Sequence, residues 1–526
     1  MSHDNNRAFR NFLMLTTTLC GGLVMVVEVL GARVIGPFFG VSLFVWTALI
    51  TVTLLSLSIG YALGGWLADR HPEPDWLFGI IALAGVFVML VPLLKSTVIL
   101  ATVPIGLRAG ALLSAVILFG PALLLLGCVS PYVVRIATRE LVQLGRTVGL
   151  LYALSTVGSM LGTALAGYVI IAYIGVGRAF QLCGALLLLL GLAYFLLFRR
   201  RIASAAGLLV LGLALWPASG PLPVATLADG TQARLVASND SHYGNVKIVE
   251  YHGTNGSIRE MLIDGVVQGG IDIRSGLSIY EYSYLLEALP LAVNPELRSA
   301  LVVGLGAGVL PDRLQRRGIE VESIDIDPLV VAMAERHFGL RVEHPVVTED
   351  ARLYLAGEGR RFDLVVMDAF AGDVSPSHLL TREALARVRA RLTDDGVVAI
   401  NLLASKRAES QLLPTVVRTL RTQFAEVAAF PLFNPADPAA RGGNIVLLAG
   451  NRKLDAALRT HLTGVHPMAD TLVQLALRQG RLVSVPEQGM ILSDDFNPLD
   501  VLDIEMHEHV RRSILETTPP AILLYG

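Results

Sequence analysis

The stretch "SALVVGLGAGVLPDRL", residues 299–314, decides the fold of the second half of this chain. An apolar run ends in three glycines, Gly304, Gly306 and Gly308, and a helical pattern follows. This order is typical of a strand that enters a tight turn ahead of a helix, as in nucleotide-binding α/β proteins. Dinucleotide sites use the spacing G-x-G-x-x-G, because the third glycine lets the helix approach a pyrophosphate. The spacing here is G-x-G-x-G, so the turn favours a different nucleoside ligand.

Strand and helix patterns alternate on from this turn. Strand patterns lie at 299–304, 320–325, 343–348, 362–367 and 396–401. Helical patterns lie between them, for example at 328–338 and 381–392. Such alternation predicts a mostly parallel, doubly wound sheet that binds ligands beyond the carboxyl ends of its strands.

Acidic residues end three successive strands of the predicted sheet. Asp325 is placed to accept hydrogen bonds from both ribose hydroxyls, and Asp350 to accept one from the amino group of adenine. Asp368 ends the fourth strand. Together with the glycines, these acids suit a nucleoside without phosphates and would attract the positive charge of a sulfonium ion. We therefore expect an adenosyl-sulfonium ligand rather than a nicotinamide.

Each of these acids also has a purely structural alternative. Asp often caps a helix, and Asp350 precedes a helical pattern. For Asp325 this alternative is weaker, because the order I-D-I-D-P makes Asp327 the better cap, with Pro328 in the first turn.

The first two hundred residues have the composition of a membrane domain. The whole chain of 526 residues is 53% hydrophobic and only 16% charged, and most of the apolar excess lies before residue 220. A helix needs about 20 apolar residues to cross a bilayer. Candidate spans lie at 12–31, 42–66, 77–95, 109–134, 148–173 and 178–198, with a weaker seventh at 203–218. We predict a multi-pass transmembrane domain over 1–220 with six to eight spans.

Arginines give the expected orientation of this domain. They cluster between spans at Arg70, at 135–146 and at 199–201, so the positive-inside rule places these loops and the N-terminus in the cytoplasm. A true seventh span would export everything after it. We therefore expect 203–218 to be half-inserted or interfacial, or an additional span to lie around 96–108. The expected location is the bacterial inner membrane with a cytoplasmic catalytic domain.

The remaining membrane residues carry weaker signals. Cys20, Cys128 and Cys183 all lie in spans without metal-ligand spacing, so we expect packing residues and no metal. Glu28 either faces a polar interior or pairs with Arg33 at a helix end. "GYALGGWLADR", residues 60–70, offers small residues for close helix packing and resembles a loop of major-facilitator transporters. The net charge of −2 gives no reason to expect nucleic acid.

Over about 234–450 the sequence resembles the polyamine aminopropyltransferases, the spermidine synthase family, and most of all their membrane-fused bacterial branch. The blocks that carry the resemblance occur in the family's order. They are "DSHYGNVKIVEY" (240–251), "REMLIDGVVQGG" (259–270), "YEYSYLLEALPL" (280–291), the glycine turn, "SIDIDPLVV" (323–331), "VVTEDARLYL" (346–355) and "FDLVVMDAF" (362–370).

The resemblance implies an architecture and a reaction. A small β-hairpin domain at 225–290 would precede a Rossmann-like α/β domain at 291–526, of the class I S-adenosylmethionine-dependent transferase type, with a C-terminal extension. The chain would move the aminopropyl group of decarboxylated S-adenosylmethionine to a diamine such as putrescine. The products would be methylthioadenosine and spermidine, and the protein would form a homodimer.

The resemblance also implies roles for individual residues. The donor site would comprise the glycine turn, Asp325 with Ile326, Asp350 with Ala351, Gln268 and Tyr243. The acceptor amine would meet Tyr282, Ser283 and the catalytic base Asp368. Asp373 either replaces a second family acid or is a loop residue. Asp494 and Asp495 either complete the amine pocket or cap a turn ahead of Pro498.

Departures from the family pattern leave other functions open. The family's glycine turn carries an acid that binds the terminal amine of the donor, and this chain has Ala307 there. Without that acid, intact S-adenosylmethionine would be repelled less, which favours a methyl- or alkyltransferase. Glu28 and the transporter-like loop favour a third alternative, a transporter or sensor whose soluble domain binds a polyamine or nucleoside without turnover.

Overall fold

The computed structural model describes residues 3–40, 43–137, 144–216, 221–254, 256–341, 343–370, 375–406, 410–434, 436–438, 440–483 and 488–525. The chain divides into two compact units. The first comprises residues 1–221, 240–244 and 524–526, and the second comprises 222–239 and 245–523.

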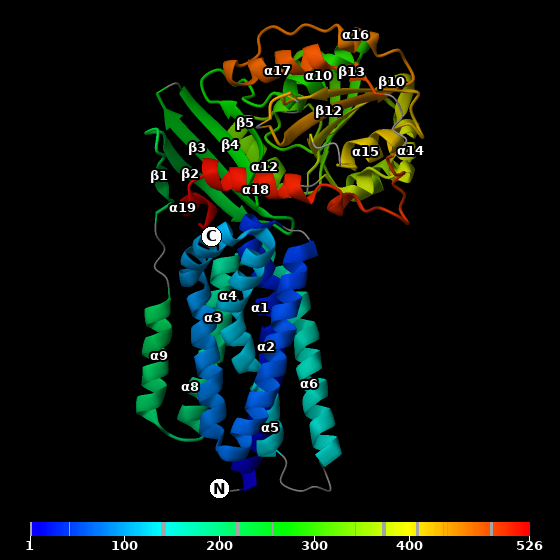
Figure 1. Ribbon diagram of the computed structural model, residues 1–526. Coiled ribbons are helices and arrows are strands. Elements are labelled where there is room, and N and C mark those ends of the chain that lie inside the picture. The colour runs from blue at the N-terminus through cyan, green and yellow to red at the C-terminus, as the bar shows by residue number, and fades with distance from the viewer. Residues whose placement is uncertain are drawn as a thin grey trace. The chain divides into compact units, whose positions relative to one another are not determined.

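The first unit is helical (Figure 1). Its helices are α1 (His3–Phe39), α2 (Leu43–Arg70), α3 (Pro74–Thr102), α4 (Leu107–Gly127), α5 (Val129–Ala137), α6 (Leu144–Leu165), α7 (Ile171–Tyr173), α8 (Val176–Leu197) and α9 (Ile202–Leu215). Within the described residues, six helical stretches are long and apolar enough to cross a membrane. They match the six strong spans expected from the sequence.

The two additional spans considered from the sequence are absent from the described residues. Helix α9 has only 14 residues, fewer than the ~20 that a crossing needs. Residues 96–105 are not a separate span, because they continue α3 into the short helix η1 (Val103–Ile105) as one stretch, Pro74–Ile105. The expectation of a span around 96–108 was therefore wrong.

Small residues let these helices approach closely, as the segment 60–70 predicts. A Cβ atom on Gly60 would lie 2.2 Å from the backbone oxygen of Leu124. Glu28 lies inside α1 and not at its end, and its carboxylate accepts a hydrogen bond from Thr53 of α2. Its polar partner is therefore on a neighbouring helix. The three cysteines are free and buried.

The second unit begins with a five-stranded sheet in the order β1-β2-β3-β4-β5. Its strands are β1 (Val224–Thr226), β2 (Gln232–Asp240), β3 (Asn245–Gly253), β4 (Gly256–Ile263) and β5 (Val266–Asp272). Asp264 and Gly265, with φ angles of +47° and +80°, form the two-residue turn between β4 and β5. Asp-Gly is favoured there because a tight hairpin turn of this kind requires positive φ at both positions.

An eight-stranded sheet follows in the order β13-β11-β12-β10-β9-β6-β7-β8. Its strands are β6 (Ser299–Val303), β7 (Glu320–Asp325), β8 (Val347–Thr348), β9 (Phe362–Met367), β10 (Leu392–Ser405), β11 (Glu426–Pro431), β12 (Gly442–Gly450) and β13 (Arg481–Leu482). The pairs from β8 to β10 are parallel, and those from β10 to β13 are antiparallel. This is the Rossmann-like domain that the alternating pattern predicts.

Four of the expected elements have different bounds. The strand expected at 299–304 ends at Val303, and the strand expected at 396–401 is the longer β10. The strand expected at 343–348 is only Val347–Thr348, because β8 pairs with just the last two residues of β7. The helix expected at 381–392 ends earlier, because α14 (Arg382–Ala390) stops before Leu392, which pairs with Phe362 as β10 begins.

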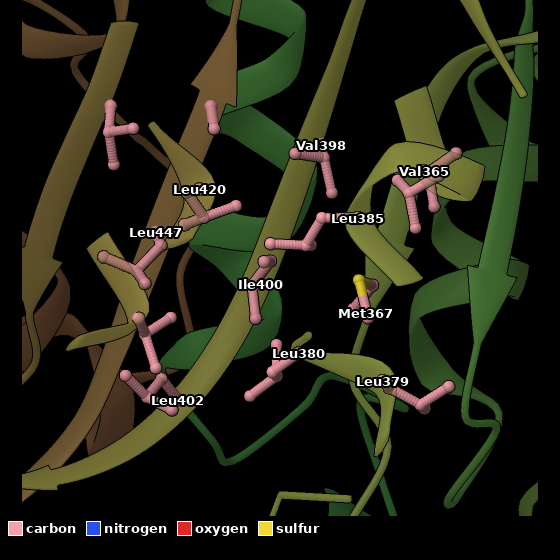
Figure 2. Packing of buried hydrophobic residues seen from close by; sticks show 14 of the residues in the cluster. Val365, Met367, Leu379, Leu380, Leu385, Val398, Ile400, Leu402, Leu420 and Leu447 are labelled. Atoms are coloured by element: carbon pink, nitrogen blue, oxygen red, sulfur yellow. The ribbon is translucent and has the colours of Figure 1, made fainter. Parts of the chain in front are cut away.

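Apolar side chains cover both faces of the central strands. Val365 and Met367 of β9 belong to one cluster, with α14 and α15 (Leu412–Leu420), which Figure 2 shows from close by. Leu364 and Val366 belong to the cluster on the other face, with α10 (Tyr282–Val293) and α17 (Pro467–Gln479). Burial of both faces is the usual condition of a parallel sheet.

The order of the strands fixes where a ligand is expected. From β6 the chain adds β7 and β8 on one side and then crosses to β9 and β10 on the other, so the strand order reverses between β6 and β9. Ligands of doubly wound sheets bind at this switch point. The remaining helices of the unit are α11 (Val309–Arg316), α12 (Pro328–Phe338), α13 (Ala351–Ala356), α16 (Asp455–Leu458), α18 (Ile504–Thr517), α19 (Pro520–Leu523), η4 (Ser377–Leu379) and η5 (Leu499–Val501).

Candidate active site

The glycine turn after β6 packs directly against two neighbouring strand ends. The φ angles of Gly304, Gly306 and Gly308 are +90°, +51° and +73°. Residues with a side chain rarely adopt such angles. A Cβ atom on Gly304 would lie 2.2 Å from the backbone oxygen of Asp368, and one on Gly306 would lie 2.5 Å from that of Gln268. The turn therefore tolerates only glycine at these two points, and it brings β5 and the end of β9 together.

Asp325, at the end of β7, is held by backbone groups. Its two oxygens accept hydrogen bonds from the N–H groups of Leu305 and Asp327, each at 2.9 Å. Burial raises the pKa of Asp325 to about 6, although these hydrogen bonds act to lower it. Because each oxygen can accept a second hydrogen bond, the carboxylate can still serve a ribose. Asp327 caps α12 by accepting from the N–H of Leu329 at 2.9 Å, as the sequence predicts.

Asp350 caps the helix that follows it. One of its oxygens accepts from the N–H groups of Arg352 at 2.7 Å and Leu353 at 3.2 Å. The other lies 3.5 Å from Nε2 of His378. Asp350 therefore acts as a helix cap, which is the structural alternative considered from the sequence. Contact between Asp350 and an adenine amino group stays a prediction.

A series of hydrogen-bonded side chains ends on Asp368. Asn401 of β10 donates from Nδ2 to Oδ1 of Asp368 at 2.8 Å, and Asn444 of β12 donates to Oδ1 of Asn401 at 2.9 Å. Burial raises the pKa of Asp368 to about 7, while the hydrogen bond from Asn401 acts to lower it. A carboxyl group with such a pKa can accept a proton near neutral pH, as a general base must.

Sequence reasoning missed both asparagines. The one available signal was a polar residue inside an apolar run, since Asn401 interrupts "GVVAINLL", residues 396–403. Asn401 is almost fully buried, and a buried amide needs partners. Its partners come from β9 and β12, which only the folded sheet brings beside it.

Asp368 lines a cleft of about 1390 Å³ within the second unit. Three other residues expected at the site also line it: Gln268, Tyr282 and Gly306. From the mouth of β9 the cleft continues past β4 and β5 to α18, the red helix in Figure 1. Small-molecule sites are usually about 300–1000 Å³, so the cleft has room for an extended acceptor.

Carboxylates dominate the charge of this cleft. Among its described lining residues are Asp229, Glu260, Asp272 and Asp368, against one arginine, Arg274. Fixed negative charge of this kind attracts cations, so the cleft suits an amine or a sulfonium ion. Within the described ranges, no three His, Cys, Asp or Glu side chains come together as a metal site.

Two tyrosines lie side by side in the cleft. The ring centroids of Tyr280 and Tyr282 are 6.2 Å apart, with the planes inclined by 29°. The hydroxyl of Tyr280 donates to Oε1 of Glu260. Burial, and then the charge of Asp368, raises the pKa of Tyr282 well above its usual value. Sequence reasoning selected Tyr282 but missed Tyr280 and Glu260.

Several expected site residues do not line the cleft. Those in the described part of the chain are Tyr243, Ser283, Asp325, Ile326, Asp350, Ala351, Asp495, Gly304 and Gly308. Ser283 is buried, and its hydroxyl donates to the backbone oxygen of Tyr280 at 2.8 Å. This hydrogen bond stabilises the start of α10. Tyr243 and Asp495 are exposed, and their roles stay predictions. Asp373 lies outside the described residues.

The acidic segment near residue 494 takes part in packing. Asp494 accepts from Oγ1 of Thr381 at 2.8 Å and pairs with Arg352. These contacts tie the segment to the starts of α13 and α14 and not to the cleft.

Comparisons with known proteins identify the family. No protein-family model matches the chain. The chain is 30% identical over 224 residues to a polyamine aminopropyltransferase of Vibrio vulnificus, an alignment that covers 40% of this chain and 72% of that protein. It is 31% identical over 217 residues to an N-terminal histidine N-methyltransferase of Emericella nidulans, covering 37% of this chain and 38% of that one.

A solved structure of a probable spermidine synthase from Corynebacterium glutamicum is also similar to the chain. It is 15% identical, with a TM-score of 0.39, and the match covers 50% of this chain and 98% of that one. The similarity to the Vibrio protein spans more than two thirds of that relative's length. The chain therefore belongs to the polyamine aminopropyltransferase family and is a transferase that uses a donor of the S-adenosylmethionine type.

Proposed function

We propose that the chain is a membrane-anchored aminopropyltransferase. It moves the aminopropyl group of decarboxylated S-adenosylmethionine to a diamine such as putrescine and releases methylthioadenosine and spermidine. The observation that carries this proposal is Asp368, a carboxylate with a pKa of about 7 that lines an acidic cleft beside the glycine turn.

Asp368 binds the attacking amine and takes its proton. A primary amine has a pKa near 10.4 and arrives as an unreactive ammonium ion. The carboxylate of Asp368 attracts that ion and accepts one proton, and the free nitrogen lone pair attacks the carbon attached to sulfur. The C–N bond forms as the C–S bond breaks, and the sulfonium becomes a neutral thioether. Asn401 keeps the carboxylate oriented through its 2.8 Å hydrogen bond.

The donor lies across the switch point of the sheet in this proposal. Asp325 holds the ribose, Asp350 meets the adenine amino group, and Gln268 of β5 meets the aminopropyl chain. Ile326 and Ala351 border the same ligand. The close packing of Gly306 against Gln268 supports this arrangement, because it leaves the turn without side chains where the donor passes.

Product release distinguishes this activity from its alternatives. The full-length protein, purified in detergent, is incubated with putrescine and with either decarboxylated or intact S-adenosylmethionine. We expect methylthioadenosine and spermidine from the decarboxylated donor only. Failure to release methylthioadenosine with any amine would refute the proposal.

A second candidate is an S-adenosylmethionine-dependent N-methyltransferase of the same fold. Ala307 favours it, because no acid at this point of the turn repels the carboxylate of the intact donor. The 31% identity to an N-methyltransferase points the same way. Release of S-adenosylhomocysteine from the intact donor in the same assay would establish this activity instead. Membership in a family of transferases disfavours a transporter or sensor without turnover.

We further propose an inner-membrane location with the catalytic domain in the cytoplasm. Six crossings return the chain to the side of its N-terminus, and the arginines at 199–201 follow the sixth. A C-terminal green fluorescent protein should fluoresce, whereas alkaline phosphatase at the same point should be inactive. The opposite result would place the domain outside. The family resemblance suggests a homodimer, which light scattering of the purified protein tests.

A further inference from the structure

Glu260 is a buried carboxylate in the cleft that the proposed mechanism does not use. It lies on β4, is only 8% exposed and lines the cleft that Asp368 lines. Its cross-strand neighbour is Gly270, where a Cβ atom would lie 3.1 Å from Cγ of Glu260 and 3.2 Å from Cε2 of Tyr280. The glycine thus leaves the room that these two side chains occupy.

The arginines near Glu260 are committed to another acid. Successive side chains of a strand point to opposite faces, so Arg259 and Glu260 diverge. Arg259 and Arg234 both pair with Glu250 of β3. Among the described residues, the only partner of Glu260 is the hydroxyl of Tyr280, and no basic side chain forms an ion pair with Glu260.

A buried carboxylate without a cation is unusual inside a protein. Removing such a group from water is unfavourable unless a counter-charge or several hydrogen bonds compensate. Glu260 has one hydrogen bond from a neutral phenol, and it faces a cleft that already carries an excess of negative charge. The missing counter-charge can therefore come from a ligand that enters the cleft.

Glu260 and Asp368 are linked by the pair of tyrosines. Tyr282 lies close enough to Asp368 for that carboxylate to influence its pKa, and its ring stacks on that of Tyr280. Tyr280 in turn holds Glu260. The cleft thus offers two carboxylates with aromatic surface between them, which matches two ammonium groups joined by a methylene chain.

We propose that Glu260 binds the second ammonium group of the acceptor and makes the enzyme select linear diamines or polyamines over monoamines. This inference rests on the proposed function. Asp368 receives the reacting amine, the faces of Tyr280 and Tyr282 pack against the methylenes, and Glu260 with Tyr280 holds the distant ammonium. The family resemblance implies no role for Glu260. Selection of the acceptor by this residue would therefore be a property of this chain.

Comparing two amines of equal length tests the inference. Putrescine and n-butylamine share a four-carbon chain, but butylamine lacks the second ammonium group. With the full-length protein and saturating decarboxylated S-adenosylmethionine, kcat/KM is measured for both amines in the wild type and in Glu260→Gln. Losing a hydrogen bond between charged groups should lower kcat/KM for putrescine by about 10- to 100-fold. For butylamine, kcat/KM should stay within about 2-fold of the wild-type value, because a substitution that removes no contact with the substrate usually has a small effect.

The ratio of kcat/KM for putrescine to kcat/KM for butylamine distinguishes a lost contact from a damaged fold. A damaged fold would lower both values, because both are measured on the same variant. Glu250→Gln is a matched control, since Glu250 is a buried acid of the same sheet that does not line the cleft. It should lower the melting temperature and leave the ratio unchanged. Tyr280→Phe, which removes the phenol hydroxyl but keeps the ring, should reduce the ratio less than Glu260→Gln does.

The outcomes separate this inference from the proposed function. Equal ratios in the wild type and Glu260→Gln would overturn the inference while the enzyme remains an aminopropyltransferase. If the wild type transfers aminopropyl to neither amine, the proposed function fails, and calorimetric titration with the same amines then decides the inference. Tighter binding of putrescine than butylamine that is lost in Glu260→Gln would support it, and equal binding would overturn it.

Discussion

Asp325 and Asp368 end the two strands that flank β6, yet they are held in different ways. Two backbone N–H groups fix Asp325, whereas the side-chain amide of Asn401 holds Asp368. Burial raises the pKa of both, to about 6 and about 7. Backbone donors come with the fold itself, but an amide side chain can be exchanged by one substitution. The comparison therefore separates an acid that the backbone holds, proposed to bind the donor, from an acid whose pKa a single side chain can adjust, proposed as the base.

The donor half and the acceptor half of the proposed site differ in the same way as these two acids. The proposed donor half consists of a glycine turn and strand-end acids, features that local sequence specifies. The proposed acceptor half consists of Asp368, Asn401, Tyr282, Tyr280 and Glu260, which come from four segments and line one cleft. Changes of substrate are therefore expected in the acceptor half, where a single side chain alters the pocket without disturbing the turn.

The largest expected effect comes from removing the proposed base. Asp368→Asn should lower kcat by about 10²- to 10⁴-fold, because general base catalysis usually contributes that much. The amide has the same shape and can still bond to Asn401, so the fold should persist. Donor binding, measured by calorimetry with methylthioadenosine, should stay within a few-fold of the wild type. Turnover at the wild-type rate would contradict the assigned role of Asp368.

Asp325→Asn should have the opposite kinetic signature. Weakening the hydrogen bonds to the ribose should raise KM for the donor by about 10- to 100-fold. The value of kcat at saturating donor should remain near that of the wild type, because the proposed contact of Asp325 is with the ribose and not with the reacting atoms. Steady-state kinetics with varied donor concentration checks this. A loss confined to kcat would show that the two acids do not divide the work as proposed.

The pH dependence of the wild type follows from the pKa of Asp368. Only the ionised form can take a proton, so kcat/KM for the amine should rise about tenfold per pH unit below pH 7 and level off above it. A bound ammonium favours the ionised carboxylate, so the corresponding limb of kcat should lie at lower pH. A flat profile between pH 5 and pH 8 would exclude Asp368 as the base.

The same group affects stability in the absence of ligand. The folded chain holds the proton of Asp368 more tightly than the unfolded chain, whose Asp residues have pKa values near 3.9. The contribution of this group to stability therefore falls as the pH rises from about 4 to 7. Melting temperatures across this range, compared with those of Asp368→Asn, measure that contribution.

Local patterns in the sequence predicted most of the framework. The bounds expected for the strands at 320–325 and 362–367 and the helix at 328–338 agree with β7, β9 and α12. Alternation and the Asp327–Pro328 helix start are local signals, so they need no knowledge of the folded chain. The strand at 343–348 was overestimated because an edge strand extends only as far as its single neighbour pairs with it.

The missed residues share one physical cause. Asn401 is a single polar residue in an apolar run, and Glu260 follows Arg259 in a strand. Neither has a local spacing that indicates chemistry. Their significance depends on side chains that the sheets place beside them, namely Asp368 for one and Tyr280 for the other. A single sequence does not specify such pairings, whereas a glycine turn followed by an acid some twenty residues later is a spacing that the sequence itself shows.

The smallest expected effect tests how Asn401 tunes Asp368. Its hydrogen bond lowers the pKa of Asp368 against the larger effect of burial, so Asn401→Leu should raise that pKa further. The acidic limb of kcat/KM should then move to higher pH by about 0.5 to 1 unit, the equivalent of one hydrogen bond. Asn444→Leu, which removes only the bond between the two amides, should shift the limb less. Equal shifts in both variants would mean that burial, and not the direct hydrogen bond, sets the basicity of Asp368, and the contrast with the backbone-held Asp325 would lose its basis.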